Sequence, residues 1–386
     1  MEPKIRLKGF NGEWKETTYG ETVTINSGMD YKHLSVGNIP VYGTGGYMLS
    51  VNESLSETDA IGIGRKGTID KPQLLKAPFW TVDTLFFMTP KNGNNLNFLF
   101  SLSQRTAWRK YDESTGVPSL SKVNIAKIDI SIPMKDEQFA IASYFQNLDI
   151  LIQNTTNKVD SLKQVKAASL QSMFPHEGET TPRVRFKGFE GEWEKVLVGK
   201  MGTTYSGLSG KTKDDFGIGE ARFVTFLNVL TNAIIDTSIL EAVNVFEGDH
   251  QNEVRKGDLL FNTSSETPEE VGMCAVMDED LTNVYLNSFC FGFRVTDENI
   301  DSTFIAYLMR SHIGRRIMSI LAQGATRYNL SKNSFCKAEL LLPKTKAEQQ
   351  QIANYFISLD SQIALQTQRL EKLKQIKSAC LDNMFV

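Results

Sequence analysis

The sequence predicts an α+β fold in which two mixed domains alternate with two long helices that pack on each other. The segments Glu137–Phe174 and Glu348–Phe385 are near-copies at an offset of 211 residues, identical at 18 of 38 positions. The segments Pro3–Trp14 and Pro182–Trp193 share eight of twelve positions at an offset of 179. Because the offset grows from 179 to 211, the second middle segment is 32 residues longer. A repeated framework therefore carries two unlike middle segments.

The repeat divides the chain into four parts. We expect a first mixed domain over residues 1–133 and a first long helix over 134–175. A linker and the second mixed domain follow over 176–343, and the second long helix covers 344–386. The polar segment Pro175–Pro182 is the expected linker between the repeats.

The two long segments have the apolar spacing of a helix. Apolar residues recur at intervals of three, four and seven, and neither segment contains Pro or Gly. At 1.5 Å per residue each helix would be about 57 Å long, so we expect each to need the other as a packing partner. The middle of each helix is more polar than its ends: Thr155 and Lys158 in the first copy match Gln366 and Arg369 in the second. These residues either specify partners and register or simply face solvent. The residues expected in the contact are Ile141, Tyr144, Leu148, Ile152 and Leu162 in one copy and Ile352, Tyr355, Leu359, Ile363 and Leu373 in the other.

Both middle segments share one plan of strands, glycine-rich turns and late helices. In the first, β-rich runs at 39–47, 60–69 and 78–88 precede a helical stretch near 96–110. In the second, β-rich runs at 223–229, 256–265 and 289–295 precede helices near 302–321. Ser121-Lys122 with Pro133, and Ser331-Lys332 with Pro343, occupy matching places in the plan, which predicts a common α+β fold.

The composition indicates a globular protein. The 386 residues, 41% hydrophobic and 10% aromatic, can fill two or three domain cores. The N-terminus lacks the apolar segment of a signal peptide, and no run of 18 apolar residues occurs, so we expect a cytoplasmic protein without a membrane span. Four cysteines without a CxxC pair fit a reduced compartment and no zinc site. The net charge of −3 means that any charge that binds DNA is local or is supplied by partners.

Short motifs of catalytic proteins occur here without the context that their chemistry needs. Gly62–Gly67 matches GxGxxG, but Pro72 follows where a helix is required, so we interpret it as a glycine-rich turn. Gly210-Lys211-Thr212 lacks the first glycine of a P-loop, where Tyr205 stands. The four histidines lack metal-ligand spacing. We expect no catalytic residue, metal or cofactor in this chain.

Basic and polar residues, most of them in the predicted loops and two of them (Arg315 and Arg316) on a predicted helix, are candidates for contact with nucleic acid. Neighbouring glycines allow close approach of the backbone to phosphate, and polar side chains can reach base edges. For each residue alone, a solvated surface or a capped turn is an equally good interpretation, but their occurrence in both repeats favours contact. The candidates are Tyr42, Gly43, Gly45, Arg65, Lys66, Ser121 and Lys122 in the first domain and Arg222, Thr263, Ser264, Ser265, Glu266, Arg315, Arg316, Arg327, Tyr328 and Lys332 in the second.

The duplicated PxxRxxGFxGEW starts and the duplicated EQxxIAxYF…LD…LKQxK…MF helices resemble the specificity (S) subunit of type I restriction-modification systems. The segments Ile39–Tyr47, 62–67 and Gly257–Gly272 are similar to parts of that family's target recognition domains. The resemblance covers nearly the whole chain. It implies that each mixed domain reads one half of a split, asymmetric site in double-stranded DNA. It also implies that the helices form an antiparallel coiled-coil spacer.

The resemblance further implies partners. Two modification subunits that bind S-adenosylmethionine would dock on the helices and methylate adenine, and restriction subunits would use ATP and Mg to translocate and cleave DNA. The chain itself would be non-catalytic. A helix of about 57 Å corresponds to about 17 base pairs, which is an upper limit for the half-site spacing. The alternative is a scaffold or adaptor whose two lobes bind something other than DNA; an enzyme with an unrecognised site is a third hypothesis.

Overall fold

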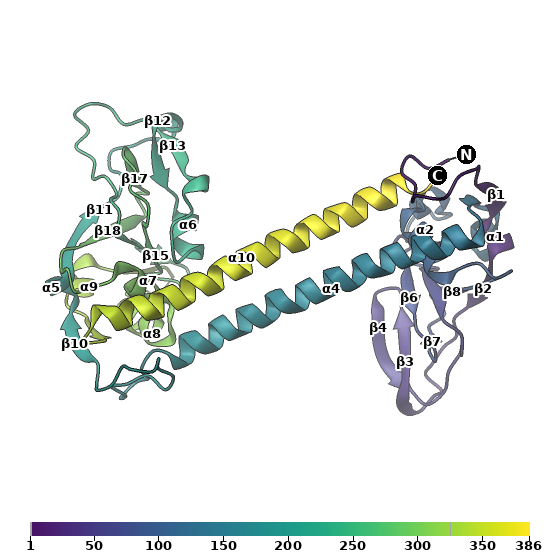
Figure 1. Ribbon diagram of the computed structural model, residues 1–386, viewed down its shortest axis with the longest axis horizontal. Coiled ribbons are helices and arrows are strands. Elements are labelled where there is room, and N and C mark those ends of the chain that lie inside the picture. Colours follow the sequence, from purple (N-terminus) through teal and green to yellow (C-terminus); the bar gives the residue numbers. More distant parts are fainter. Residues whose placement is uncertain (1, 325) are drawn as a thin grey trace. The chain divides into compact units, whose positions relative to one another are not determined.

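The computed structural model describes residues 2–324 and 326–386, which fold into two compact units (Figure 1). Unit 1 consists of the chain up to residue 158 together with residues 366–386. Unit 2 consists of residues 159–365. Each unit thus combines one mixed domain with parts of two long helices.

The long helices are α4 (Lys135–Ser172) and α10 (Lys346–Asn383), each of 38 residues. They confirm the two uninterrupted helices that the repeat predicts. Within the described ranges, no helix has the length and apolar character needed to cross a membrane.

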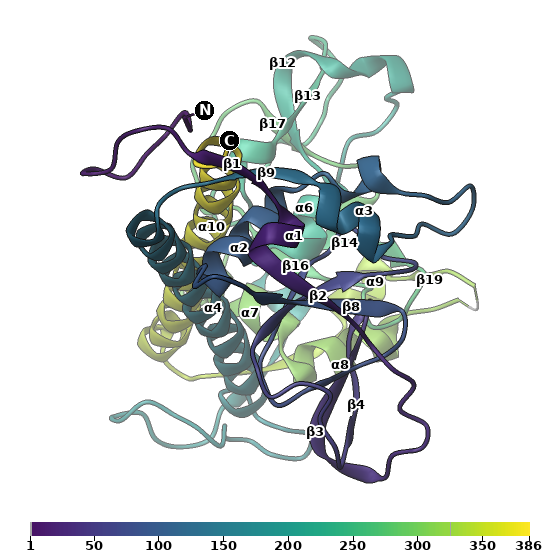
Figure 2. The same cartoon turned by 90° about the vertical axis from the view of Figure 1, so that its right-hand side faces the viewer.

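Two sheets and a strand pair form the mixed domain of unit 1. The first sheet contains, in order, β2 (Val23–Ser27), β8 (Leu85–Pro90), β5 (Ala60–Gly64) and β6 (Gln73–Leu75). The second contains β4 (Gly46–Val51), β3 (Val36–Gly43) and β7 (Trp80–Thr81). Figure 2 shows the pair of β1 (Lys15–Thr18) and β9 (Asp129–Ile132) close to both chain ends. The residues after Gly64 lead without a helix into β6, which agrees with a turn at GxGxxG.

Apart from its parts of α4 and α10, the helices of unit 1 are short. They are α1 (Tyr19–Thr22), α2 (Leu96–Arg105), a 3-10 helix (Trp108–Tyr111) and α3 (Lys122–Lys127). The helical stretch expected near 96–110 is confirmed, but residues 106–107 divide it into α2 and the 3-10 helix. The helix ends because Thr106 is extended, and its hydroxyl lies 2.7 Å from the hydroxyl of buried Tyr19.

Unit 2 repeats this plan. Its sheets are β11 (Gly202–Ser206), β18 (Cys290–Val295), β14 (Leu259–Asn262) and β16 (Cys274–Val276), and β13 (Glu241–Val243), β12 (Phe216–Val224) and β17 (Val284–Leu286). Two strand pairs are β10 (Glu194–Leu197) with β20 (Glu339–Leu342) and β15 (Ser264–Ser265) with β19 (Tyr328–Asn329). The helices are α5 (Val198–Met201), α6 (Phe226–Thr231), α7 (Ser302–Arg310), α8 (His312–Leu321) and α9 (Lys332–Cys336), with 3-10 turns at Lys213–Asp215 and Thr237–Ile239.

The end of each long helix completes a core in which the other long helix takes part. In unit 1, Phe385 follows α10 and packs 5.8 Å from Phe145 of α4, measured between ring centroids. In unit 2, Phe174 follows α4 and stacks 5.9 Å from Phe356 of α10. All four rings are buried. Because the end of one helix meets the beginning of the other in both units, the helices are antiparallel within each unit.

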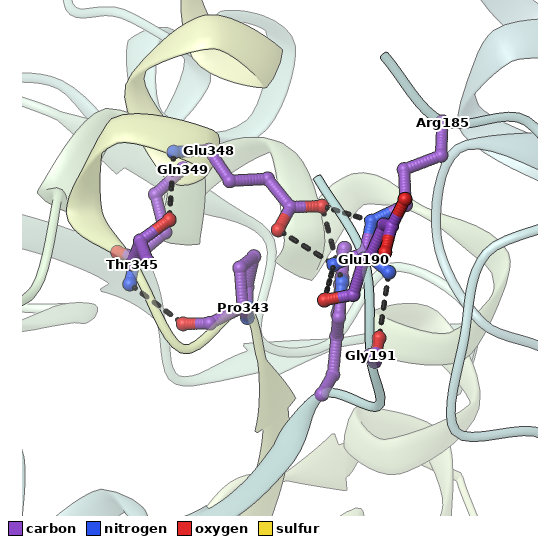
Figure 3. Close-up of polar contacts among 8 residues, drawn as sticks. Arg185, Glu190, Gly191, Pro343, Thr345, Glu348 and Gln349 are labelled. Carbon is purple, nitrogen blue, oxygen red and sulfur yellow. Dashed lines mark hydrogen bonds and ion pairs between the residues drawn. The ribbon is translucent and has the colours of Figure 1, made fainter. Parts of the chain in front are cut away.

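An ion pair with a buried glutamate fixes the start of each repeat to its long helix, and Figure 3 shows the pair of unit 2. In unit 2, the Arg185 guanidinium donates to both carboxylate oxygens of Glu348 at 2.7 and 2.8 Å and to the carbonyl of Gly191 at 2.6 Å. In unit 1, Arg6 makes the same bidentate pair with Glu137 at 2.8 and 2.7 Å. This clamp explains why the Arg of PxxRxxGFxGEW and the Glu of EQxxIAxYF recur together.

The glutamine that follows the clamp glutamate in each long helix adds further bonds to the clamp. Gln138 Nε2 donates to the carbonyl of Pro133, and its Oε1 accepts from the backbone N–H of Asn95. Gln349 makes the equivalent bonds to Pro343 and Asp301. A buried amide bonded on both sides joins the helix to the preceding strand and to the mixed domain.

Contacts between the long helices repeat in the two units. In unit 1, Lys377 pairs with Asp149, and the Tyr144 hydroxyl lies 3.3 Å from Cys380 Sγ. In unit 2, Lys166 pairs with Asp360, and the hydroxyls of Tyr355 and Ser169 lie 2.9 Å apart. The ten residues predicted for helix packing are placed as follows: Ile141, Leu148, Ile352 and Leu359 are buried, whereas Tyr144, Ile152, Leu162, Tyr355, Ile363 and Leu373 are half-buried.

Candidate nucleic-acid interface

The two mixed domains build one backbone framework around their Ser-Lys landmarks. In unit 1, the backbone N–H of Leu120 donates to the carbonyl of Arg65 at 2.9 Å. In unit 2, the N–H of Leu330 donates to the carbonyl of Thr263 at 2.8 Å. In each case the acceptor follows an internal strand, and the donor precedes the Ser-Lys pair.

Neighbouring bridges fix the correspondence. Lys66 pairs with Ser119 in unit 1, and Ser264 pairs with Asn329 in unit 2. The equivalent positions are therefore Arg65 and Thr263, Lys66 and Ser264, Ser121 and Ser331, and Lys122 and Lys332. The framework is the same, but the side chains at the first two positions differ in charge and length.

In unit 1 this framework surrounds a hollow of about 500 Å³. The Arg65 guanidinium carbon and Lys122 Nζ each lie 5.9 Å from the centre of the Phe86 ring. Attraction to the ring face helps to hold both cations in place. The remaining lining residues are Ser27, Lys66, Glu113, Ser119, Leu120 and Ser121.

Acidic side chains shape the rim of this hollow. Glu113 accepts hydrogen bonds from Ser121 Oγ at 2.7 Å and from Asn124. The Asp112 carboxylate accepts from the backbone N–H groups of Ser119 and Ser114, and these bonds lower the pKa of Asp112. The loop before the Ser-Lys pair is thus ordered by bonds that use its carboxylates.

Tyr42, Gly43 and Gly45 lie at the tip of the β3–β4 hairpin in the same unit. Gln73 Nε2 donates to the carbonyl of Gly43 at 2.9 Å. A Cβ added at Gly67 would lie 3.9 Å from Thr44 Oγ1. The structure therefore brings this tip next to the turn that carries Arg65 and Lys66.

The equivalent surface of unit 2 is polar and largely self-bonded. Thr263 Oγ1 donates to the carbonyl of Phe289 at 2.8 Å, and Ser265 Oγ donates to Glu270 Oε2 at 2.8 Å. Lys332 Nζ lies 2.6 Å from Ser206 Oγ. Ser264 is buried, Tyr328 is half-buried, and Glu266 and Arg327 are exposed.

Three predicted arginines lie elsewhere. The guanidinium of Arg315 donates to the carbonyls of Glu269, Val271 and Gly272, so this side chain supports the loop after β15. Burial lowers its pKa to about 10. Arg316 is exposed and pairs with Glu177 at 2.5 Å.

Arg222 belongs to β12, in a different sheet from the paired strands at Ser264 and Tyr328, and its guanidinium lies 3.3 Å from the carbonyls of Gly219 and Ala221.

The sequence pattern did not identify Phe86, Ser27 or Glu113. Phe86 occupies β8 opposite Ser27 of β2, and nothing local distinguishes it from the neighbouring buried aromatic residues. Its role depends on two cations that reach it from other segments. Within the residues that the structure describes, no group of three His, Cys, Asp or Glu side chains is placed to hold a metal ion.

The family model of type I restriction modification DNA specificity domains matches residues 11–164 and again residues 191–375. The chain belongs to this family. Its two matches coincide with the two repeats, so this specificity protein carries two copies of the domain.

Individual relatives agree with this membership. The specificity subunit of the type I restriction enzyme MjaVIII from Methanocaldococcus jannaschii is 21% identical over 341 residues, which cover 85% of this chain and 75% of the relative.

Solved structures support the fold. The S subunit of a type I restriction-modification system from M. genitalium covers 100% of this chain and 99% of its own, with 15% identity and a TM-score of 0.67. A chain from a structure of type I R-M complex assembly and conformational transition covers 97% of this chain and 98% of its own, with 14% identity and a TM-score of 0.54.

Membership in this family settles the general role. The chain serves DNA sequence recognition in a type I restriction-modification system, and the scaffold hypothesis is not favoured. Specificity subunits of these systems are non-catalytic and act within a complex.

Proposed function

We propose that each unit reads one half of a split, asymmetric site in double-stranded DNA through the surface around its Ser-Lys pair. One observation carries this proposal: the same hydrogen-bonded framework holds Arg65 and Lys66 in unit 1 but Thr263 and the buried Ser264 in unit 2. Base edges are distinguished by the donors and acceptors that face them. Two surfaces with one backbone and different side chains suit two unlike half-sites.

The charge distribution supports a division of labour with partners. The chain as a whole carries a formal charge of −3, although Arg65, Lys66 and Lys122 gather in one hollow. Contact with the DNA backbone usually needs many cations. We propose that two modification subunits docked on α4 and α10 supply the remaining phosphate contacts.

The chemistry would then lie outside this chain. We propose that the modification subunits bind S-adenosylmethionine and methylate adenine, which they would flip from the stack into their own pocket. Restriction subunits would use ATP and Mg²⁺ to translocate and cleave DNA. Because the substrate would be double-stranded DNA inside the cell, we propose a cytoplasmic location.

The test is the methylation motif of the assembled complex. The chain is produced with its modification partner in cells that lack adenine methylation, and methylated positions are mapped across the genome. We expect a motif of two unlike halves separated by unspecified bases. A continuous motif, or no methylation by an assembled complex, would contradict the proposal.

A domain exchange tests the modularity. Replacing residues 17–133 by the matching segment of another specificity protein should change one half of the motif and leave the other half intact. Replacing residues 194–343 is the matched control and should change the opposite half. A change in both halves after either exchange would show that the units do not read separately.

A further inference from the structure

We infer that Arg65 makes the half-site of unit 1 require a guanine, and that the half-site of unit 2 lacks this requirement because Thr263 occupies the equivalent position. This inference rests on the proposed function and adds a base preference to it. It also assigns Lys122 and Lys332 to the phosphate backbone of the two half-sites.

The Arg65 side chain is exposed and held in place. Its guanidinium lies over the Phe86 ring at 5.9 Å, and Nη1 donates to the carbonyl of Asp83 at 3.4 Å. No ion pair to a carboxylate is recorded for Arg65 in the described part of the chain. Most guanidinium donors are therefore free. Preorganisation by the ring and the carbonyl reduces the entropy lost when an arginine binds a ligand.

Guanine is the base that suits such a group. Its N7 and O6 atoms are adjacent acceptors in the major groove, and a planar guanidinium can donate to both at once. Adenine offers one acceptor beside a donor amine, so the same arginine cannot make both bonds there. An exposed, ring-supported arginine on a turn that follows a strand can therefore discriminate guanine from the other bases.

Thr263 cannot replace this contact. It occupies the position of Arg65, because its carbonyl accepts from Leu330 as that of Arg65 accepts from Leu120. Its hydroxyl proton is already donated to the carbonyl of Phe289 at 2.8 Å. The short side chain leaves an acceptor and a methyl group and carries no charge.

The lysines of the Ser-Lys pairs are common to both units. Lys122 lies in the hollow that Ser27 also lines, and Lys332 Nζ lies 2.6 Å from Ser206 Oγ. Ser27 and Ser206 end equivalent strands, opposite Phe86 and Phe291. A cation kept at the same place in two surfaces that otherwise differ suits the phosphate backbone, which is the same in every sequence.

The decisive experiment measures base preference in the complete complex. The chain with Arg65→Ala is assembled with its modification partner, and methylation rates are measured on duplexes that carry each base at every position of both half-sites. We expect one guanine position in one half-site to lose on the order of 10- to 100-fold discrimination, with the other half-site unchanged. Thr263→Arg should add a preference for guanine at one position in the other half-site.

Variants of the two lysines should change DNA affinity and its salt dependence, and not the base preference. Lys122→Ala and Lys332→Ala should each weaken DNA binding equally for all sequences and reduce the slope of log affinity against log salt by about 1. Lys127→Ala is the matched control, because Lys127 is exposed at the other end of α3. Its salt slope should stay at the wild-type value.

Two failures are distinguishable. If the wild-type motif is split but Arg65→Ala only slows methylation of every duplex equally, the base assignment of Arg65 is wrong and the proposed function stands. If the wild-type complex has no split motif, the proposed function itself fails. Unfolding temperatures of all variants, compared with wild type, exclude loss of folding as the cause.

Discussion

Removing the half-buried arginine of one clamp should destabilise the unit that contains it. In Arg185→Met, the Glu348 carboxylate, only 2% exposed, loses both guanidinium bonds at 2.7 and 2.8 Å. Trp193 Nε1, at 3.3 Å, remains as a side-chain donor. Breaking a buried ion pair by removing one partner costs about 3–5 kcal/mol, which is a large part of the stability of a domain.

The loss of the arginine should cost different amounts of stability in the two copies of the clamp. Trp14 is the equivalent of Trp193, but its Nε1 is buried without a hydrogen-bond partner among residues 2–324 and 326–386. Glu137 therefore has no tryptophan donor to fall back on after Arg6→Met. We expect this variant to cost about 1 kcal/mol more than Arg185→Met, which is the value of one hydrogen bond.

Hydrogen exchange in urea resolves the units, because each opens with its own free energy. Arg183→Met is the matched control, since Arg183 pairs with Glu179 on the surface and its side chain is 60% exposed; its cost should stay below about 1 kcal/mol. The double variant Arg185→Met with Glu348→Leu should be more stable than Arg185→Met alone. Equal costs for Arg185→Met and Arg183→Met, or a loss spread evenly over both units, would refute the reasoning.

Three further predictions concern other sites. Leu148→Asp places a charge in the buried seam of unit 1 and should cost at least about 3 kcal/mol, whereas Leu151→Asp, on the exposed side of α4, should cost less than about 1 kcal/mol in the same urea assay. The lowered pKa of Asp112 means that its bond to the N–H of Ser119 stabilises the loop above the unfolded pKa of about 3.9 and is lost as the pH falls through the native pKa; Asp112→Ala should reproduce this loss at neutral pH as faster exchange of the Ser119 amide. Burial raises the pKa of Cys290 to about 12, so a thiol reagent at pH 8 should modify it only after urea unfolds unit 2.

The long helices and the repeat were predictable because they depend on local or internal information. Apolar periodicity without Pro or Gly predicts a helix from the sequence alone, and the near-identity of two segments indicates that they form the same structure. The exact ends of the late helices were less predictable. The helical stretch expected near 96–110 breaks at Thr106, which is extended and whose hydroxyl lies 2.7 Å from the hydroxyl of buried Tyr19.

The candidate surface was predicted only in part. The turn at Arg65, the Ser-Lys pairs and the hairpin tip were identified, and the structure brings those of unit 1 together. The hydrogen bonds of Arg315 to the loop after β15 were not predictable, because an arginine beside another arginine on a helix resembles a residue of a solvated face. The direction of the Arg315 side chain depends on the carbonyls of Glu269 and Gly272, which lie 46 and 43 residues earlier in the chain.

The sequence by itself thus determined the duplicated α+β plan, the two helices and the family. Tertiary structure alone decided that Arg6 reaches Glu137, 131 residues away, and that Phe86 lies beneath two cations. The physical reason is that periodicity and repetition are written along the chain, whereas the direction of a side chain is fixed by partners that only folding brings near.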